Sequence, residues 1–297
     1  MKYIVCRGCP ASGKTTWAKK YRSKNGVVRA NRDDTRRELF DFGQWSEYKF
    51  TGQKEARVTE VLDAHIQRAY DNGFDVIDDN TNLTRFNTTI RKAEEIGFDV
   101  HVKDFFDVHL HQLIDRNIAR EYSVPEHVIH KMFKDQMKLQ DRDIKPQGKS
   151  KSCIIVDIDG TVADMGKGTD WGRSPYQWDR VMNDRPRENV VNVVRQLGIS
   201  GKNIVFLTGR DGVSYNDTKE WLERHVVNLG DEATLFYELY SRDADDMRAD
   251  CIVKEELLKK YVLPTYDVEF CIDDRKQMVD HYRALGLECW QVDAGNF

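Results

Sequence analysis

Residues Gly8–Thr15 read Gly-Cys-Pro-Ala-Ser-Gly-Lys-Thr and match the pattern G-x-x-x-x-G-K-[ST]. They follow the apolar run Lys2–Arg7, which predicts a strand, and open Lys14–Tyr21, which predicts a helix. A glycine-rich turn between a strand and a helix directs backbone N–H groups and the positive helix end toward an anion. The segment therefore predicts a P-loop in a parallel α/β domain that binds the phosphates of a nucleoside triphosphate.

Two side chains of this loop have defined expected roles. The ammonium group of Lys14 is expected to reach the β- and γ-phosphates of the nucleoside triphosphate, and the hydroxyl of Thr15 is expected to hold Mg²⁺. Glycines allow the backbone to wrap closely around the phosphates. The residues expected to bind ATP are Gly8, Ser12, Gly13, Lys14, Thr15 and Thr16.

Carboxylates also follow the next predicted strands, Val27–Ala30 and Phe74–Ile77. The carboxyl ends of parallel strands face one crevice, so Asp33 is positioned to take a proton from an attacking hydroxyl. Its neighbour Asp34 is assigned mainly to the favourable end of a helix. Arg36 is expected either to grip a phosphate of the acceptor or to be a solvated helix residue. Asp79–Asn82 is a further crevice segment that turn chemistry explains nearly as well.

Two helices, His109–Arg120 and Glu126–Gln140, are predicted after the last strand of this half, Asp99–Phe106. Arg116 and Arg120 are four residues apart and are therefore expected on one helix face. Placed over the P-loop, they would stabilise a transferring phosphoryl group; elsewhere they would be a basic stripe.

The segment 143–152 combines Pro, Gly, Ser and Lys without an apolar period and is predicted to be a linker between domains 1–142 and 153–297. Strands and helices alternate again beyond it, which predicts a second α/β domain. Its first strand ends in Asp157-Ile158-Asp159-Gly160-Thr161. Two carboxylates in one crevice allow one to attack phosphorus and the other to give a proton to the leaving oxygen.

Length and charge limit the function. A chain of 297 residues is long enough for about two domains. The net charge is +4 up to Ser150 and −8 after it, so the chain lacks the broadly basic signature of duplex binders. It has no apolar run of about 18 residues and no signal-peptide core, which predicts a cytoplasmic protein without a membrane span. Its six scattered cysteines are expected to be reduced thiols rather than disulfides or zinc ligands.

The Asp157–Thr161 motif is similar to the D-x-D-G-T signature of the haloacid-dehalogenase-type phosphatases. Further matches follow in order: Thr208-Gly209-Arg210, then Lys254, then Asp273-Asp274. The resemblance implies a Rossmannoid phosphatase domain with an aspartyl-phosphate intermediate and a Mg²⁺ site. The implied metal ligands in this domain are Asp157, Asp159, Asp273 and Asp274.

The chain as a whole resembles the bacteriophage polynucleotide kinase/3′-phosphatase family, with the kinase first. The resemblance rests on Gly8–Trp17, Asn31–Asp34, Glu47–Lys49, Val253–Glu256 and Glu288–Val292. It implies transfer of the ATP γ-phosphate to 5′-hydroxyl ends of RNA or DNA and removal of 3′-phosphate or 2′,3′-cyclic phosphate ends before ligation.

The resemblance also implies residue roles. Lys14, Asp33 and Arg120 are the implied catalytic residues of the kinase, with Asp157 as nucleophile and Asp159 as acid/base of the phosphatase. The implied substrate-binding residues are Arg36, Arg116, Arg173, Thr208, Arg210, Arg242 and Lys254. A homotetramer and a ligase partner are implied as well. Gly168–Trp171 is extra length before Arg173, and Thr15 replaces a frequent serine.

Two alternative functions come from other classes. The first is a small-molecule kinase joined to a metabolite phosphatase, which an assay on strand ends, nucleosides and sugars distinguishes. The second is a non-catalytic scaffold that binds strand ends, which requires degenerate motifs, whereas the motif residues are present here.

Overall fold

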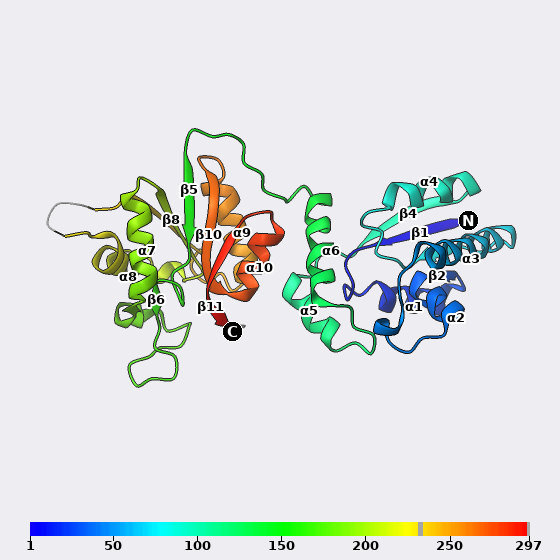
Figure 1. The fold of residues 1–297 in the computed structure, drawn as a ribbon, viewed down its shortest axis with the longest axis horizontal. Helices are drawn as coiled ribbons and strands as arrows, with labels where there is room; N and C mark the ends of the chain where they lie inside the picture. Colours follow the sequence, from blue (N-terminus) through cyan, green and yellow to red (C-terminus); the bar gives the residue numbers. More distant parts are fainter. Residues whose placement is uncertain (231–233, 296–297) are drawn as a thin grey trace. The chain divides into compact units, whose positions relative to one another are not determined.

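Two compact units, Met1–Arg142 and Asp143–Phe297, make up the chain in the computed structural model, which describes residues 1–230 and 234–295. Each unit has its own parallel sheet with helices packed on both faces (Figure 1). Each sheet therefore supplies a separate crevice at the carboxyl ends of its strands.

The N-terminal sheet has the order β2-β3-β1-β4, and every neighbouring pair is parallel. Its central strands are short and almost completely buried, as expected for strands covered on both faces. The strands are β1 (Lys2–Arg7), β2 (Val28–Ala30), β3 (Val76–Asp78) and β4 (Asp99–Asp104).

Helices α3 and α4 cover one face of this sheet, and α1 covers the other. The sequence patterns did not predict α4, because it begins without a side-chain cap and carries Thr88, Thr89 and Ile90 in its first half. The helices are α1 (Lys14–Asn25), α2 (Arg32–Phe40), α3 (Gly52–Asp71), α4 (Phe86–Ile96), α5 (Leu110–Ile118) and α6 (Glu126–Leu139), with a 3₁₀ turn, η1 (Trp45–Glu47).

Helix α5 packs against α6, but it ends at Ile118 rather than at Arg120. The Asn117 side chain donates to the Val124 carbonyl (2.8 Å) and accepts from the Val124 amide (3.0 Å). These two bonds fasten the following turn to the helix end. The prediction that Arg116 and Arg120 share a helix face is therefore wrong, because Arg120 lies in the turn.

The C-terminal sheet has the order β11-β10-β5-β8-β9 and is also parallel throughout. Helices α7 and α8 pack on one face, and α9 and α10 pack on the other. The strands are β5 (Ser152–Val156), β8 (Asn203–Thr208), β9 (Tyr237–Ser241), β10 (Asp267–Arg275) and β11 (Cys289–Gly295). The helices are α7 (Glu188–Ile199), α8 (Tyr215–Leu222), α9 (Asp250–Leu257) and α10 (Lys276–Ala284).

A small antiparallel ribbon, β6 (Ala163–Asp164) and β7 (Arg185–Pro186), stands beside this sheet. The 3₁₀ segment η2 (Trp178–Asn183) lies within the connection between its two strands. The insertion Gly168–Trp171 belongs to this connection. The third strand that the sequence predicts in this half, Thr234–Leu239, is displaced toward Tyr237–Ser241, and residues 231–233 lie outside the described part of the chain.

The segment predicted to be a linker is held against the C-terminal unit. The Ile144 amide donates to the Leu285 carbonyl, and the amides of Gln147 and Lys149 donate to the two carboxylate oxygens of Asp267. The backbone amides of this polar, glycine-containing segment thus have hydrogen-bond acceptors in the C-terminal unit, and the segment is not a solvated connector.

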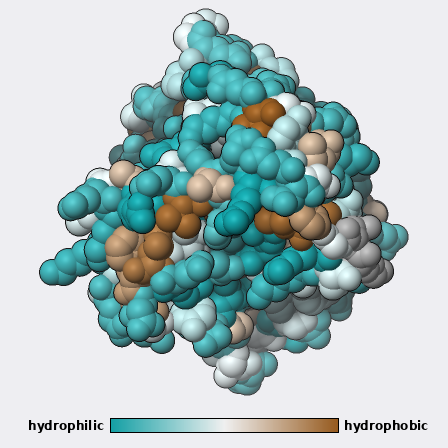
Figure 2. Space-filling view, turned by 90° about the vertical axis from the view of Figure 1, so that its right-hand side faces the viewer, coloured by the Kyte–Doolittle hydropathy of each residue, from teal (hydrophilic) through white to brown (hydrophobic). Residues whose placement is uncertain are grey.

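In the described ranges no helix is long and apolar enough to cross a membrane. On the face drawn in Figure 2, hydrophobic residues gather in small separate patches among hydrophilic ones.

Candidate active sites

The P-loop leads from β1 into α1 with its lysine at the centre. Gly13 has a left-handed φ of 100° at the helix cap, a conformation that glycine adopts without a steric penalty. The Lys14 ammonium donates to the carbonyls of Gly8 (2.8 Å) and Cys9 (2.6 Å) and lies 3.3 Å from the Ser12 hydroxyl. Burial lowers the pKa of Lys14 to about 8. A phosphate entering the loop would stabilise the charged ammonium.

A carboxylate from the end of β3 completes the loop. The Thr15 hydroxyl donates to Oδ1 of Asp79 (3.3 Å), and Arg29 donates to Oδ2 of the same carboxylate (2.7 Å). Burial raises the pKa of Asp79. A loop hydroxyl beside a strand-end carboxylate is the ligand pair that P-loop proteins use for Mg²⁺. The sequence left Asp79–Asn82 unresolved, and within it Asp79 contacts the loop.

The next candidate residues lie in the first turns of α2. The Asn31 side chain accepts from the Asp34 amide (3.0 Å) and caps the helix, so the structural assignment of Asp34 agrees with the geometry. Asp33 keeps 47% of its side chain exposed. Arg36 donates to Asp33 through Nη1 (2.7 Å), which orients the carboxylate.

The sequence analysis did not identify Glu55 on α3, because a single acidic residue in a predicted helix belongs to no recognisable motif. It accepts from Arg36 through both oxygens (2.9 and 2.6 Å), from Arg32 (3.0 Å) and from the Tyr48 hydroxyl (3.0 Å). The hydrogen bonds from Arg36 lower the pKa of Glu55 to about 2. Glu55 therefore fixes the arginine that in turn orients Asp33.

A pocket of about 280 Å³ lies over this part of the sheet, with Thr15, Asp33 and Arg120 among its lining residues. Arg120 thus comes from the turn after α5 to the same space as the P-loop hydroxyl and the expected base. Arg116 is exposed on α5 and does not line this pocket.

The second site lies at the ends of β5 and β10. The Lys254 ammonium on α9 donates to Asp157 (2.7 Å) and to Asp273 (3.0 Å). Asp157, Asp273 and Asp274 are buried and place one carboxylate oxygen each within 4.8 Å of one another. One lysine cannot neutralise three carboxylates. The cluster therefore fits a divalent cation with oxygen ligands.

The glycine of the motif allows this approach. Gly160 has a left-handed φ of 79°, and a Cβ there would stand 2.1 Å from Oδ2 of Asp274. The Thr161 hydroxyl donates to Oδ1 of Asp274 (3.1 Å), which orients that carboxylate.

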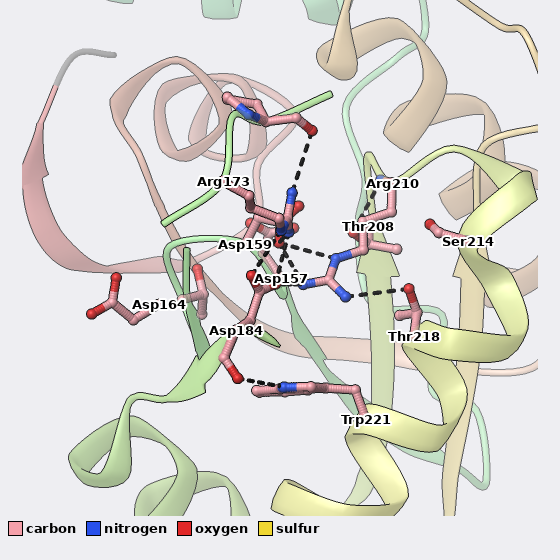
Figure 3. A network of polar contacts seen from close by, with 12 residues as sticks. Asp157, Asp159, Asp164, Arg173, Asp184, Thr208, Arg210, Ser214, Thr218 and Trp221 are labelled. Atoms are coloured by element: carbon pink, nitrogen blue, oxygen red, sulfur yellow. Dashed lines mark hydrogen bonds and ion pairs between the residues drawn. The ribbon is translucent and has the colours of Figure 1, made fainter. Parts of the chain in front are cut away.

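Asp159 faces a different group of partners (Figure 3). It accepts from Arg173 (2.7 Å) and Arg210 (2.6 Å), and both arginines also donate to Asp184. Buried Trp221 donates its ring N–H to the Asp184 carbonyl (2.8 Å). The two guanidinium groups lower the pKa of Asp159 despite its burial.

This network changes two expectations. The Asp159 carboxylate is directed to arginines and is not part of the acidic cluster, so its assignment as a side-chain metal ligand does not fit the structure. Arg173 and Arg210 are 1% and 0% exposed and hold carboxylates, so they position Asp159 rather than present themselves to a substrate phosphate. Asp184, which joins them, was missed because it follows a 3₁₀ segment without a motif.

The other expected phosphate-binding residues lie around this site. Thr208 ends β8 and is buried, with its hydroxyl accepting from the Arg210 amide (3.2 Å). Arg242 pairs with Asp250 at the start of α9, and Arg275 pairs with the same carboxylate. The Asp250 carboxylate thus fixes two arginines near the end of β10.

Comparison with known proteins agrees with both sites. Residues 151–297 match the family model of the polynucleotide kinase PNKP phosphatase domain, and residues 4–140 match the model of an AAA domain. Each model matches one half of the chain, and together the two cover almost all of it. The chain is a P-loop kinase domain followed by a PNKP-type phosphatase domain. Kinase and phosphatase domains of these types use ATP and a divalent metal.

One curated relative, a putative bifunctional polynucleotide kinase/RNA ligase of Autographa californica nuclear polyhedrosis virus, is 28% identical over 299 residues. The match covers 96% of this chain but 41% of that protein, so the chain spans about two-fifths of its relative. Two solved structures of Pnkp1/Rnl/Hen1 complexes, one of them titled as an RNA repair complex, align over the whole chain and 97% of theirs. Their identities are 26% and 27%, each with a TM-score of 0.44.

Metal is expected to stabilise the phosphatase domain in a pH-dependent way. Burial and the charge of Asp157 raise the pKa of Asp274 to about 6, and burial raises the pKa of Asp157 as well. The folded domain therefore holds protons that the unfolded chain has lost, and its free energy of unfolding falls as the pH rises from about 4 toward 7. A cation replaces those protons and reverses the loss.

We expect MgCl₂ to raise the melting temperature of this domain more at pH 8 than at pH 5. At a hundred times the dissociation constant, the stabilisation is about 2.7 kcal/mol. Differential scanning calorimetry at both pH values measures it, with Asp274→Asn as the variant that loses the response. An equal or larger shift at pH 5 would contradict the acidic cluster as the metal site.

Removal of Asp184 is expected to disorganise the phosphatase site alone. Asp184→Ala leaves Arg173 and Arg210 buried with one carboxylate between them, which costs roughly 3–5 kcal/mol. Phosphatase activity is expected to fall while ATP-dependent transfer is retained. Asp164→Ala is the matched control, because Asp164 is an exposed carboxylate of the same ribbon that points away from the network (Figure 3). Equal effects of the two variants would refute this role.

Proposed function

We propose that the chain repairs nucleic-acid ends, with each domain acting on a different terminus. The kinase domain transfers the γ-phosphate of ATP to a 5′-hydroxyl, and the phosphatase domain removes a 3′-phosphate or a 2′,3′-cyclic phosphate. The observation that carries the proposal is that one chain holds two separately built phosphate sites, the second in a domain of the polynucleotide kinase PNKP type. Different termini avoid a futile cycle.

In the kinase domain, Asp33 accepts the proton of the attacking 5′-hydroxyl, because its carboxylate is exposed to the pocket and oriented by Arg36. Lys14 holds the phosphates, and Arg120 stabilises charge on the transferring group. Thr15 and Asp79 would hold Mg²⁺, which neutralises charge on the β- and γ-phosphates.

Arg36 has a narrower role than the resemblance implies. It already binds Asp33 and Glu55, and its side chain is 13% exposed. We propose that it contacts the acceptor's 3′-phosphate along its remaining edge while it continues to hold Asp33. Arg116, exposed on α5, would interact with the strand outside the pocket described above.

In the phosphatase domain, Asp157 attacks the 3′-phosphorus and forms an aspartyl-phosphate as the bond to the 3′-oxygen breaks. Asp159, whose pKa is lowered by Arg210 and Arg173, takes a proton from the water that hydrolyses the intermediate, and in that protonated form it gives the proton to the leaving 3′-oxygen of the next turnover. Lys254 offsets the repulsion between Asp157 and the incoming phosphate. Asp157, Asp273 and Asp274 would hold Mg²⁺, which supplies Lewis-acid stabilisation.

Thr208 and Arg242, the latter with 10% of its side chain exposed, are then the groups left to contact the 3′-end. Thr208 stands at the carboxyl end of β8, and Arg242 follows β9, so both lie at the edge of the sheet that carries Asp157. Their hydroxyl and guanidinium groups suit phosphate oxygens.

One relative joins a polynucleotide kinase to an RNA ligase by its name. We propose on this basis that a ligase acts on the ends that this chain prepares. The homotetramer implied by the family resemblance stays a prediction, which sedimentation velocity of the full chain would test.

A doubly marked strand tests the proposal. A 5′-hydroxyl, 3′-phosphate oligonucleotide is incubated with ATP labelled at the γ-phosphate and MgCl₂, in RNA and DNA versions. We expect label at the 5′-end and release of inorganic phosphate from the 3′-end. Unchanged termini, together with rapid conversion of a free nucleoside or sugar phosphate, would establish the metabolite enzyme instead.

A further inference from the structure

An exposed aromatic ring lies next to Arg36, the residue that donates to Asp33 of the kinase pocket. The ring of Phe50, in the loop before α3, is 62% exposed. An aromatic side chain of this size loses a favourable transfer free energy when it faces water, so its exposure calls for a physical explanation.

Neighbouring aromatic rings pack against Phe50 and hold it in place. Tyr48, which is 4% exposed, meets Phe50 edge to face with centroids 4.8 Å apart, and Trp45 stacks nearly parallel to it at 6.1 Å and 16°. Phe42 packs on both Trp45 and Tyr48. Supported on its buried side by these rings, Phe50 presents the remaining surface to solvent without having to be ordered on binding.

The same ring is linked to the reacting groups. The Arg36 guanidinium lies 5.4 Å from the centre of the Phe50 ring, and Arg36 donates to Asp33. The hydroxyl of Tyr48, whose ring meets Phe50 edge to face, donates to Glu55. One guanidinium group therefore separates the exposed ring from the carboxylate that would receive the proton of a 5′-hydroxyl.

Resting on the proposed kinase function, we infer that Phe50 is a stacking platform for a nucleobase at the 5′-end of the acceptor strand. Every base has a flat apolar face, so stacking recognises a single strand without reading its sequence. The neighbouring Arg36 and Lys54 charges suit the backbone of such a strand, with the Lys54 ammonium 4.9 Å from the Tyr48 ring. The platform selects polynucleotide ends over small 5′-hydroxyl compounds that carry no base.

The test compares Phe50→Leu with Phe74→Leu, which removes another exposed ring, 48% exposed, just before β3 and so near the amino-terminal ends of the strands of the same sheet. The acceptors are a 5′-hydroxyl oligonucleotide and the same strand with an abasic residue at its first or second position. We expect Phe50→Leu to raise the KM for the intact strand roughly 5- to 100-fold with little change in kcat. Phe74→Leu is expected to match the unaltered protein.

The abasic strand separates stacking from other roles. Loss of the base is expected to raise the KM of the unaltered protein by a similar factor, and to cause little further loss in Phe50→Leu. Phe50→Tyr is expected to retain the low KM, and 3′-phosphate release by Phe50→Leu is expected to be unchanged.

Two results would overturn the inference: an unchanged KM in Phe50→Leu, whatever its oligomeric state, or the same abasic penalty in both proteins. Each leaves the proposed function intact if the unaltered protein phosphorylates the strand. Failure of the unaltered protein to phosphorylate any oligonucleotide would instead refute the proposed function itself.

Discussion

Asp157→Asn is expected to abolish release of the 3′-phosphate while phosphorylation of the 5′-hydroxyl continues at its usual rate. An amide cannot form the acyl-phosphate bond, and loss of a nucleophile costs roughly 10⁴-fold or more in kcat. Phosphate release and 5′-labelling of one doubly marked strand measure the two activities in the same tube.

A folding defect is distinguishable from this loss. Burial, together with repulsion from Asp273, raises the pKa of Asp157, so removal of its charge relieves both costs in the metal-free domain at pH 8. We expect the melting temperature there to be unchanged or higher. A lower melting temperature, or loss of the kinase activity as well, would contradict an independent nucleophile in a separate unit.

Asp33→Asn is expected to produce the reverse pattern, with 5′-phosphorylation lost and 3′-dephosphorylation retained. Removal of a general base lowers the rate roughly 10²- to 10⁴-fold. The asparagine keeps a side-chain oxygen for the hydrogen bond from Arg36, so the local structure is expected to be retained. Because the P-loop and not Asp33 holds the phosphates, binding of ATP is expected to persist. Single-turnover transfer and equilibrium binding of ATP separate the chemical step from nucleotide affinity.

Asp34→Asn is the matched control for this variant. Asp34 is the next residue of the same helix turn, is 56% exposed and pairs with Arg29 rather than Arg36. We expect its rate of transfer to stay within a few-fold of the unaltered protein. If the two variants behave alike, the proton is accepted by another group.

The sequence predicted the parts of the kinase domain that depend on local chemistry. The P-loop follows from its glycines and its position between a strand and a helix, and both features are present in the structure. Glu55 could not be predicted, because its role depends on α3 packing beside α2, which brings Arg32, Arg36 and Tyr48 together from distant positions. The sequence placed the end of α5 too late. The helix ends where the Asn117 side chain binds the backbone of Val124, and a contact between residues seven positions apart has no recognisable sequence motif.

The phosphatase domain shows the same division. Asp157, Lys254 and Asp273 were found by motif, and the structure brings them together. The partners of Asp159 were not foreseen, since neighbouring carboxylates at a strand end look equivalent in sequence. Their separation into an acidic cluster and an arginine-bound carboxylate arises from Asp184, which reaches the site from the ribbon.

The six cysteines are all buried and form no disulfides, with Cys6 and Cys9 in the kinase domain and the other four in the phosphatase domain. Burial raises the pKa of Cys9, inside the P-loop, to about 12, so this thiol stays protonated and unreactive while the domain is closed. Alkylation by iodoacetamide therefore records local opening. Peptide mass spectrometry of labelled Cys9 and Cys251 would time the unfolding of the two halves independently in one sample.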